Sequence, residues 1–208
     1  MSRSAIKIQD CKTKKLVDAV LISGVTIREA QLAQMHWSRA LDQYLKTLPK
    51  DDYPEHGGWD WEAKHRRYGR LAAYRFYGIE CEGKMQGLLE LAKEGHLAKL
   101  PEQKGRPLIY VKYIEVAAWN IKVLAPNPRF GGVGARLMKA AVELSLSEDC
   151  KGRLGLHSLP GANKGDPEWF YQHVCKMEPM ESERDGEGLL YFELTAQRAQ
   201  EFLKGGTQ

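Results

Sequence analysis

The spacing of apolar residues along the chain changes between strand-like and helical periods, and these periods predict the secondary structure. Residues 6–9 and 16–22 form short apolar runs that predict two strands joined by a basic turn. The apolar positions that follow recur every three or four residues, which predicts a helix that Pro49 ends. Thr26 and Glu29 precede this helix at the spacing of a capping box, which satisfies the first backbone amides.

The rest of the chain predicts a mixed α/β fold in a single domain, residues 1–204, followed by a polar tail at 205–208. Residues 108–119 are apolar on both faces, which predicts a covered strand near the middle of a sheet. The other predicted elements are a helix at 59–69, a hairpin of 71–80 with 85–91, a helix at 132–147, a strand at 153–159, a helix at 167–175, a strand at 189–194 and a helix from 195 to 205.

Composition and charge argue against several classes of function. A hydrophobic share of 43% predicts a sizeable core rather than disorder. The 31 Lys and Arg residues exceed the 27 Asp and Glu residues by four, too small a surplus to indicate nucleic acid or membrane by itself. The longest purely apolar runs have about five residues, against the ~20 that span a bilayer. Because no hydrophobic signal segment begins the sequence, we expect a cytoplasmic protein.

The cysteines and histidines show no metal-binding spacing. Cys11, Cys81, Cys150 and Cys175 are far apart in the sequence, and neither a CxxC pair nor an HExxH motif occurs. We therefore expect reduced thiols and no metal site.

The segment from Arg129 to Leu137 carries the clearest chemical signal. It follows the apolar strand and opens a helix, and Gly132 and Gly134 let the backbone approach a ligand closely. Backbone amides at the start of a helix bind phosphate groups. A Walker A loop is absent, and a dinucleotide-binding GxGxxG motif would need a glycine where Leu137 stands. The sequence therefore predicts a phosphate-binding loop of another kind.

The pattern Arg129-x-x-Gly132-x-Gly134 resembles the pyrophosphate-binding loop of the GNAT superfamily of acyl-CoA-dependent N-acetyltransferases. The resemblance spans about residues 71–195, and its further features are the apolar strand before the loop, the strand at 154–158, and Phe170-Tyr171 with Met177 downstream. The stretch from residue 115 to residue 177 is similar to a bacterial GNAT subgroup of undefined substrate.

This resemblance implies a fold and an activity. The fold is α/β, with a mixed, mostly antiparallel sheet that has a central V-shaped splay and is flanked by helices. The activity is transfer of an acetyl group from acetyl-CoA to an amine, on a small molecule or a peptide, by direct attack in a ternary complex. The sequence leaves open the acceptor, the acyl-chain preference and a homodimer.

The resemblance also implies site residues. Tyr171 takes the place of the general acid that protonates the departing CoA thiolate; the alternative is a core aromatic residue packed with Phe170. Backbone N–H groups around 116–118 would polarise the thioester carbonyl. The residues expected to bind the cofactor are Val116, Ala117, Ala118, Arg129, Phe130, Gly131, Gly132, Val133, Gly134 and Ala135. The sequence departs from the family in a longer loop at 120–128, in an insertion at 161–166, and after Tyr171, where the element is one residue longer and Lys176 replaces a glycine.

Glu115 is the second candidate catalytic residue. It shares an otherwise apolar strand face with Tyr113 and Ala117, where a carboxylate is costly unless it is paired or used. Two interpretations stay open: a general base for the amine, or the partner of a neighbouring base in a salt bridge.

Aromatic residues near the predicted second helix are candidates for the acceptor site. Trp59, Trp61 and Tyr53 could form a wall over the acceptor, but the preferred interpretation is that the two tryptophans fasten a helix to the sheet. His157 fits a packed strand residue beside the expected cofactor cleft.

Two alternatives to this enzyme stay open. One is a catalytically idle CoA-binding module that senses acyl-CoA or holds a partner protein. The other is an acetyltransferase acting on aminoacyl-tRNA, indicated only by the mild basicity and the basic cluster at residues 64–70.

Overall fold

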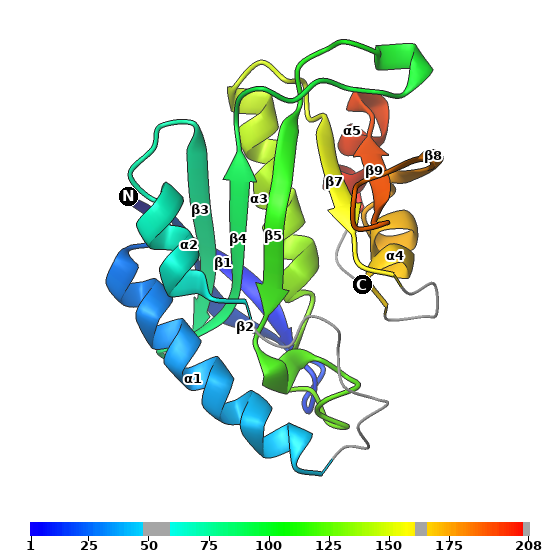
Figure 1. The fold of residues 1–208 in the computed structure, drawn as a ribbon. Helices are drawn as coiled ribbons and strands as arrows, with labels where there is room; N and C mark the ends of the chain where they lie inside the picture. The colour runs from blue at the N-terminus through cyan, green and yellow to red at the C-terminus, as the bar shows by residue number, and fades with distance from the viewer. Residues whose placement is uncertain (48–58, 161–165, 206–208) are drawn as a thin grey trace. The chain divides into compact units, whose positions relative to one another are not determined.

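The computed structural model describes residues 1–47, 59–160 and 166–205 (Figure 1). In chain order its elements are β1 (Ser2–Asp10), β2 (Leu16–Ser23), α1 (Ile27–Leu45), α2 (Trp61–Tyr68), β3 (Tyr74–Cys81), β4 (Lys84–Ala92), η2 (Pro101–Gln103), β5 (Ile109–Val116), η3 (Ala118–Asn120), β6 (Phe130–Gly131), α3 (Val133–Ser147), β7 (Leu154–Ser158), α4 (Pro167–Trp169), η4 (Phe170–Val174), β8 (Glu178–Arg184), β9 (Leu190–Leu194) and α5 (Ala196–Lys204). Among the described helices, none is both long enough and apolar enough to cross a membrane.

The strands form one mixed sheet in the order β6-β1-β2-β3-β4-β5-β7-β9-β8. The pairs β1–β2, β1–β6, β2–β3, β7–β9 and β8–β9 are antiparallel, whereas β5 and β7 are parallel. This parallel ladder has only two partner pairs, Ile109 with Leu154 and Tyr110 with Gly155, although β7 pairs with β9 over five positions. Such a short central ladder agrees with the predicted splay, and β5 lies in the middle of the sheet as predicted.

The chain divides into two compact units by its internal contacts. One comprises residues 1–89 with 114–137, and the other comprises residues 90–113 with 138–208. The organisation of residues 1–204 as a single domain stays a prediction.

In the first unit, local sequence signals position the helices. Thr26 and Glu29 form the predicted capping box: the Thr26 hydroxyl accepts from the Glu29 amide at 3.2 Å, and the Glu29 carboxylate accepts from the Thr26 amide at 2.7 Å. The buried Trp37 indole of α1 donates to the carbonyl of Met85 in β4 at 3.0 Å. Helices α1 and α2 lie side by side (Figure 1).

Gly87 of β4 allows the start of α3 to approach the strand. A Cβ atom at this position would lie 2.8 Å from Val133 and 2.9 Å from Leu137. Because real Cβ atoms do not come so close, a larger residue here would force the Val133 and Leu137 side chains to shift.

Three predictions about elements need correction. The central strand ends at Val116, not at residue 119, because the chain turns into η3. Strands β6 and β8 were not predicted, since β6 has two residues and β8, Glu178–Arg184, is mostly polar. The helix predicted at 167–175 is α-helical only at Pro167–Trp169 and then forms a π-helix, Phe170–Val174.

Candidate functional site

Glu115 lies near the end of β5, partly buried, and two donors from the chain around α2 hold one of its oxygens. Its Oε2 accepts from the Trp61 indole at 2.5 Å and from the Trp59 amide at 3.4 Å. Burial raises the pKa of the Glu115 carboxyl from 4.5 to about 7, against the lowering effects of both hydrogen bonds and of the Lys64 charge. The other oxygen, Oε1, has no hydrogen-bond partner among the described residues.

These contacts bear on both interpretations of Glu115. Within the described residues no Lys, Arg or His lies within salt-bridge distance of its carboxylate, so the salt-bridge interpretation is not supported. A carboxylate with a pKa near neutrality and one oxygen left for another molecule can accept a proton at pH 7. The geometry therefore favours the general base.

The tryptophans beside Glu115 have different environments. Trp61 is only 1% exposed and is the sole buried residue of α2, so its indole fastens this helix to β5 through Glu115 and does not form an open wall. For Trp61 these contacts favour the fastening interpretation over the acceptor wall. Trp59 is partly exposed, with the Lys64 ammonium 4.5 Å from its ring centroid. Tyr53 lies outside the described residues.

Replacing Trp61 by Phe is expected to raise the pKa of Glu115 above about 7. The indole donor favours the charged carboxylate, so its loss favours the protonated form. The measurement is a pH titration of the Glu115 carboxyl carbon by NMR. Trp37→Phe is the matched control, because it removes a buried indole donor that bonds to Met85 instead. If the pKa of Glu115 in the Trp61→Phe variant is no higher than in the Trp37→Phe variant, the Trp61 indole does not set this pKa.

The predicted phosphate-binding loop ends in a tight backbone turn at the start of α3. Gly132 has a φ of +77°, a left-handed conformation that L side chains rarely adopt, and its carbonyl accepts the first helical bond from the Arg136 amide at 3.0 Å. The first amides of an α-helix have no partner inside the helix. Those of Val133, Gly134 and Ala135 have no acceptor among the described residues, which fits a site for a phosphate group.

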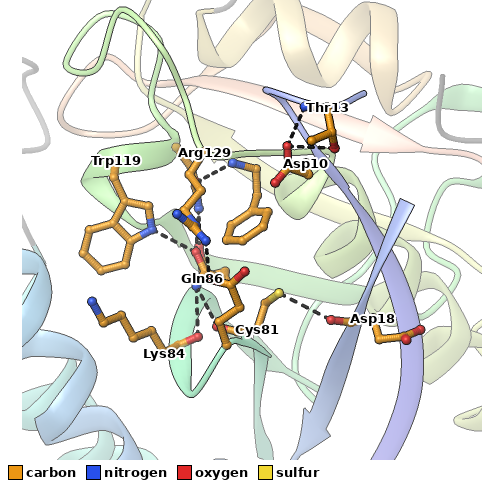
Figure 2. A network of polar contacts seen from close by, with 11 residues as sticks. Asp10, Thr13, Asp18, Cys81, Lys84, Gln86, Trp119 and Arg129 are labelled. Atoms are coloured by element: carbon orange, nitrogen blue, oxygen red, sulfur yellow. Dashed lines mark hydrogen bonds and ion pairs between the residues drawn. The ribbon is translucent and has the colours of Figure 1, made fainter. Parts of the chain in front are cut away.

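Gln86 of β4 fixes the chain on the way to this loop (Figure 2). Its side chain, 2% exposed, donates to the carbonyls of Cys81 and Lys84 at 3.1 Å each. Its Oε1 accepts from the Trp119 indole at 2.8 Å and from the side-chain Nδ2 of Asn120 at 3.0 Å. The sequence analysis did not single out Gln86, because its partners lie far apart in the chain.

The loop itself is held by further backbone bonds. The Asn120 side chain accepts from the Phe130 amide at 3.0 Å, and the Trp119 carbonyl accepts from the Arg129 amide at 3.1 Å. Arg129 forms an ion pair with Glu82 in the turn before β4, and its guanidinium carbon lies 5.1 Å from the Phe130 ring centroid. The first residue of the motif is thus engaged by a carboxylate of its own unit.

The amides expected to polarise a carbonyl are not equally available. The Ala117 amide donates to the Gln86 carbonyl at 2.9 Å, so it cannot serve a ligand while this bond is made. The prediction for residues 116–118 is therefore corrected at Ala117, whose N–H is already used. The parts assigned to Val116 and Ala118 stay predictions.

In the second unit, Tyr171 lies in the π-helix η4. Its side chain is 8% exposed and packs against Phe170, with ring centroids 5.4 Å apart, and against Phe192 at 5.9 Å. Burial raises the pKa of the Tyr171 hydroxyl above its usual value, so the group keeps its proton at neutral pH. No hydrogen-bond partner of this hydroxyl occurs among the described residues. Within residues 1–47, 59–160 and 166–205 this hydroxyl is therefore a proton donor without an acceptor.

The unusual sequence after Tyr171 has a structural reason. The Cys175 amide donates to the Phe170 carbonyl, five residues back, so the one-residue lengthening is absorbed as a wider helical turn. Lys176 then has a φ of +62°. Glycine adopts this left-handed conformation without strain, whereas a side chain such as that of Lys176 adopts it only rarely.

The same unit contains a polar cluster that the sequence analysis did not assemble. The Tyr110 hydroxyl lies 2.6 Å from His157 Nδ1, and the His96 ring stacks on Tyr110 at 4.4 Å. The pKa of His157 is lowered, chiefly by burial. The neighbouring Glu193 is fully buried and accepts from the Tyr191 hydroxyl at 2.9 Å. His157 is thus a packed strand residue, as expected, within a bonded network.

The described residues contain no group of three or more His, Cys, Asp or Glu side chains arranged to hold a metal ion. No disulfide is formed by the four cysteines, which are Cys11, Cys81, Cys150 and Cys175.

Comparison with known proteins shows the fold. The sequence matches no protein-family model, and a search of curated proteins finds no significant match. RimJ of Mycobacterium smegmatis, solved in complex with CoA-disulfide, is 16% identical, with a TM-score of 0.50 over 99% of this chain and 95% of its own. The GNAT domain of S. lividans PAT is 11% identical, with a TM-score of 0.53 over 92% of this chain and 96% of its own. An N-acetyltransferase from Staphylococcus aureus Mu50 is 12% identical, with a TM-score of 0.51 over 86% of this chain and 99% of its own. The chain therefore has the fold of GNAT acetyltransferases, which confirms the predicted fold class.

Proposed function

We propose that the protein transfers an acetyl group from acetyl-CoA to an amine by direct attack in a ternary complex. The observation that carries the proposal is Glu115: a carboxylate with a pKa near 7, one oxygen fixed by Trp61 and the other without a partner among the described residues, in a chain with the GNAT fold. Bound acetyl-CoA would supply the thioester carbonyl. Glu115 would accept the proton of the attacking amine, directly or through a water.

Other residues support this chemistry. The amides at the start of α3, which have no acceptor among the described residues, would hold the pyrophosphate, and Gly134 would let its oxygens approach because it has no side chain. An amide of Val116 or Ala118 would donate to the carbonyl oxygen as negative charge develops on it. Tyr171, protonated at neutral pH, would return a proton to the departing sulfur. The acceptor would be a small molecule or peptide with a primary amine, and a cytoplasmic location agrees with the use of acetyl-CoA.

The proposal is tested by following free thiol in a mixture of protein, acetyl-CoA and a library of amines. We expect thiol release that requires one class of amine and stays at background without it. The sensor alternative predicts acetyl-CoA binding with no amine-dependent release. A thiol signal of equal size with and without every amine would contradict the proposed transfer.

Gly134→Asp is expected to weaken acetyl-CoA binding at least ~10-fold, about 1.4 kcal/mol, by placing a negative charge against the pyrophosphate. The fold should be kept, because a carboxylate in the first turn of a helix is stabilising. Gly134 is preferred to Gly132 for this test, since a side chain at the φ of +77° would add strain. The measurement is calorimetric titration, and Gly134→Asn is the control with equal bulk and no charge. Equal affinities of the two variants would remove the phosphate assignment.

The aminoacyl-tRNA alternative depends on the basic cluster at residues 64–70. In the structure Arg66 is paired with Glu62 at 2.6 Å and the Arg67 guanidinium lies 5.1 Å from the Tyr68 ring centroid. These charges are partly engaged within α2, which does not favour RNA. Strongly salt-dependent binding of tRNA would reverse this preference.

A further inference from the structure

The second unit contains a cavity that none of the residues proposed above for the cofactor or for catalysis lines. Its volume is about 800 Å³, within the range of small-molecule sites. It is lined by the segment around η2, by the residue before β7, by Lys176 and by the first turn of α5. The lining is rich in charged side chains. The charge of a ligand that would fit the cavity therefore depends on which of these side chains already form ion pairs within the protein.

Arg153 is the most informative of the lining residues. It is 6% exposed, and its Nε donates to the Pro107 carbonyl at 2.8 Å. No carboxylate within the described ranges lies within 4.0 Å of its guanidinium, and its two terminal nitrogens have no acceptor there. The two terminal nitrogens are not among the fully buried polar atoms that lack a partner, so they reach solvent. Because Arg153 lines the cavity, these charged donors are available to an anion there.

The start of α5 contributes a second attraction for an anion at the same place. Thr195 caps this nine-residue helix by accepting from the Arg198 amide at 3.2 Å. The Ala196 amide reaches only the Gln103 side chain, at 3.4 Å, and the Gln197 amide has no acceptor in the part of the chain described. The first turn of α5, the positive end of the helix, therefore lines the same cavity as Arg153.

The other charged residues that line the cavity limit how many negative charges a ligand can carry. Arg106 and Lys176 also line the cavity, and neither forms an ion pair with a described carboxylate. Arg198 is neutralised by Glu178 at 3.0 Å. Glu102 and Glu201 line the same cavity and would repel a polyanion such as nucleic acid. The balance fits a small molecule with one anionic group.

We propose that this cavity binds a small molecule through a carboxylate or phosphate group, whose oxygens accept from the Arg153 guanidinium and from the Gln197 amide in the first turn of α5. A guanidinium presents two parallel donors to such a group, which gives both strength and orientation. The site is independent of the proposed acetyl transfer, because none of its residues is assigned to the cofactor or to the proton transfers.

The test is a titration of the full chain with inorganic phosphate and, in a second arm, with acetate, each at ionic strength held constant with sodium chloride. Backbone amide shifts of residues 196–198 are followed by NMR. We expect saturable shifts in at least one arm, and the arm that saturates at the lower concentration identifies the anionic group. Shifts that sodium chloride alone reproduces in both arms would overturn the proposal.

Matched variants locate the binding. Gln197→Glu adds a negative charge to the exposed first turn of α5, where it stabilises the helix, and should weaken binding at least ~10-fold. Gln200→Glu adds the same charge to an exposed position of the same helix outside the cavity, and should change the affinity less than about twofold. Arg153→Gln removes the buried charge, and the surface variants decide the outcome if it does not fold. Equal weakening by both surface variants would contradict the assignment.

Discussion

Glu115→Gln is expected to lower kcat/KM for an alkylamine acceptor by about 100-fold at pH 7, with partial recovery at high pH. An alkylamine has a pKa of ~10.4, about 3.4 units above pH 7. Removing the proton from its ammonium form at pH 7 therefore costs roughly 4.6 kcal/mol of free energy. Gln keeps the size and can still accept from the Trp61 indole, but it cannot take the proton. At high pH the amine deprotonates unaided, which restores part of the rate.

The pH profile of the unmodified protein provides a second readout. Because the pKa of Glu115 is raised to about 7, kcat/KM should rise as the pH rises through about 7, when the carboxylate forms. Glu143→Gln, at an exposed position of α3, should leave both the rate and the profile unchanged. A Glu115→Gln protein with the unmodified pH profile would remove the base assignment.

Stability separates a catalytic Glu115 from a structural one. The folded-state pKa is about 7 and the ordinary value is 4.5, so the folded chain binds the proton more tightly than the unfolded chain. The stability from this group is fully present below pH 4.5 and is lost as the pH rises through about 7. Above that pH, Glu115→Gln removes a buried charge, and its melting temperature should equal or exceed that of the unmodified protein. A marked loss of stability there would indicate a structural partner.

Tyr171→Phe should lower kcat about 100-fold and leave the affinity for acetyl-CoA nearly unchanged. The substitution keeps the ring contacts with Phe170 and Phe192 and removes only the hydroxyl. Turnover is measured by thiol release and affinity by calorimetry.

Tyr191→Phe is the matched control for Tyr171→Phe. Its hydroxyl donates to the buried Glu193, so its loss should cost about 1–3 kcal/mol of stability with little effect on kcat at temperatures where the variant is folded. If Tyr171→Phe turns over normally, Tyr171 is a core residue and another donor protonates the sulfur.

Signals that act over a few residues were readable from the sequence. The capping box of Thr26 and Glu29 and the hydroxyl cap of Thr195 fix the starts of α1 and α5 with neighbouring residues alone. Glu115 was recognisable because a carboxylate on an apolar strand face is costly, and its raised pKa follows from the same burial. The strand β8 has no apolar alternation, so its pairing with β9 left no periodic signal.

Long-range contacts explain what the sequence did not show. Trp61 lies 54 residues from Glu115, and only the folded chain reveals that its indole is buried against the carboxylate instead of facing an acceptor. Gln86 bonds to Trp119, 33 residues away, and thereby holds the loop before α3. Both are ordinary residues in their local sequence, and their roles arise from tertiary structure.

The most direct test of the proposed transfer is a mass spectrum of the amine after incubation with acetyl-CoA and either the unmodified protein or Glu115→Gln. The proposal predicts an acceptor heavier by one acetyl group, formed together with free CoA, and formed about 100-fold more slowly by the variant at pH 7. Acetyl-CoA that binds to the protein while every amine in a broad library stays unmodified would contradict it.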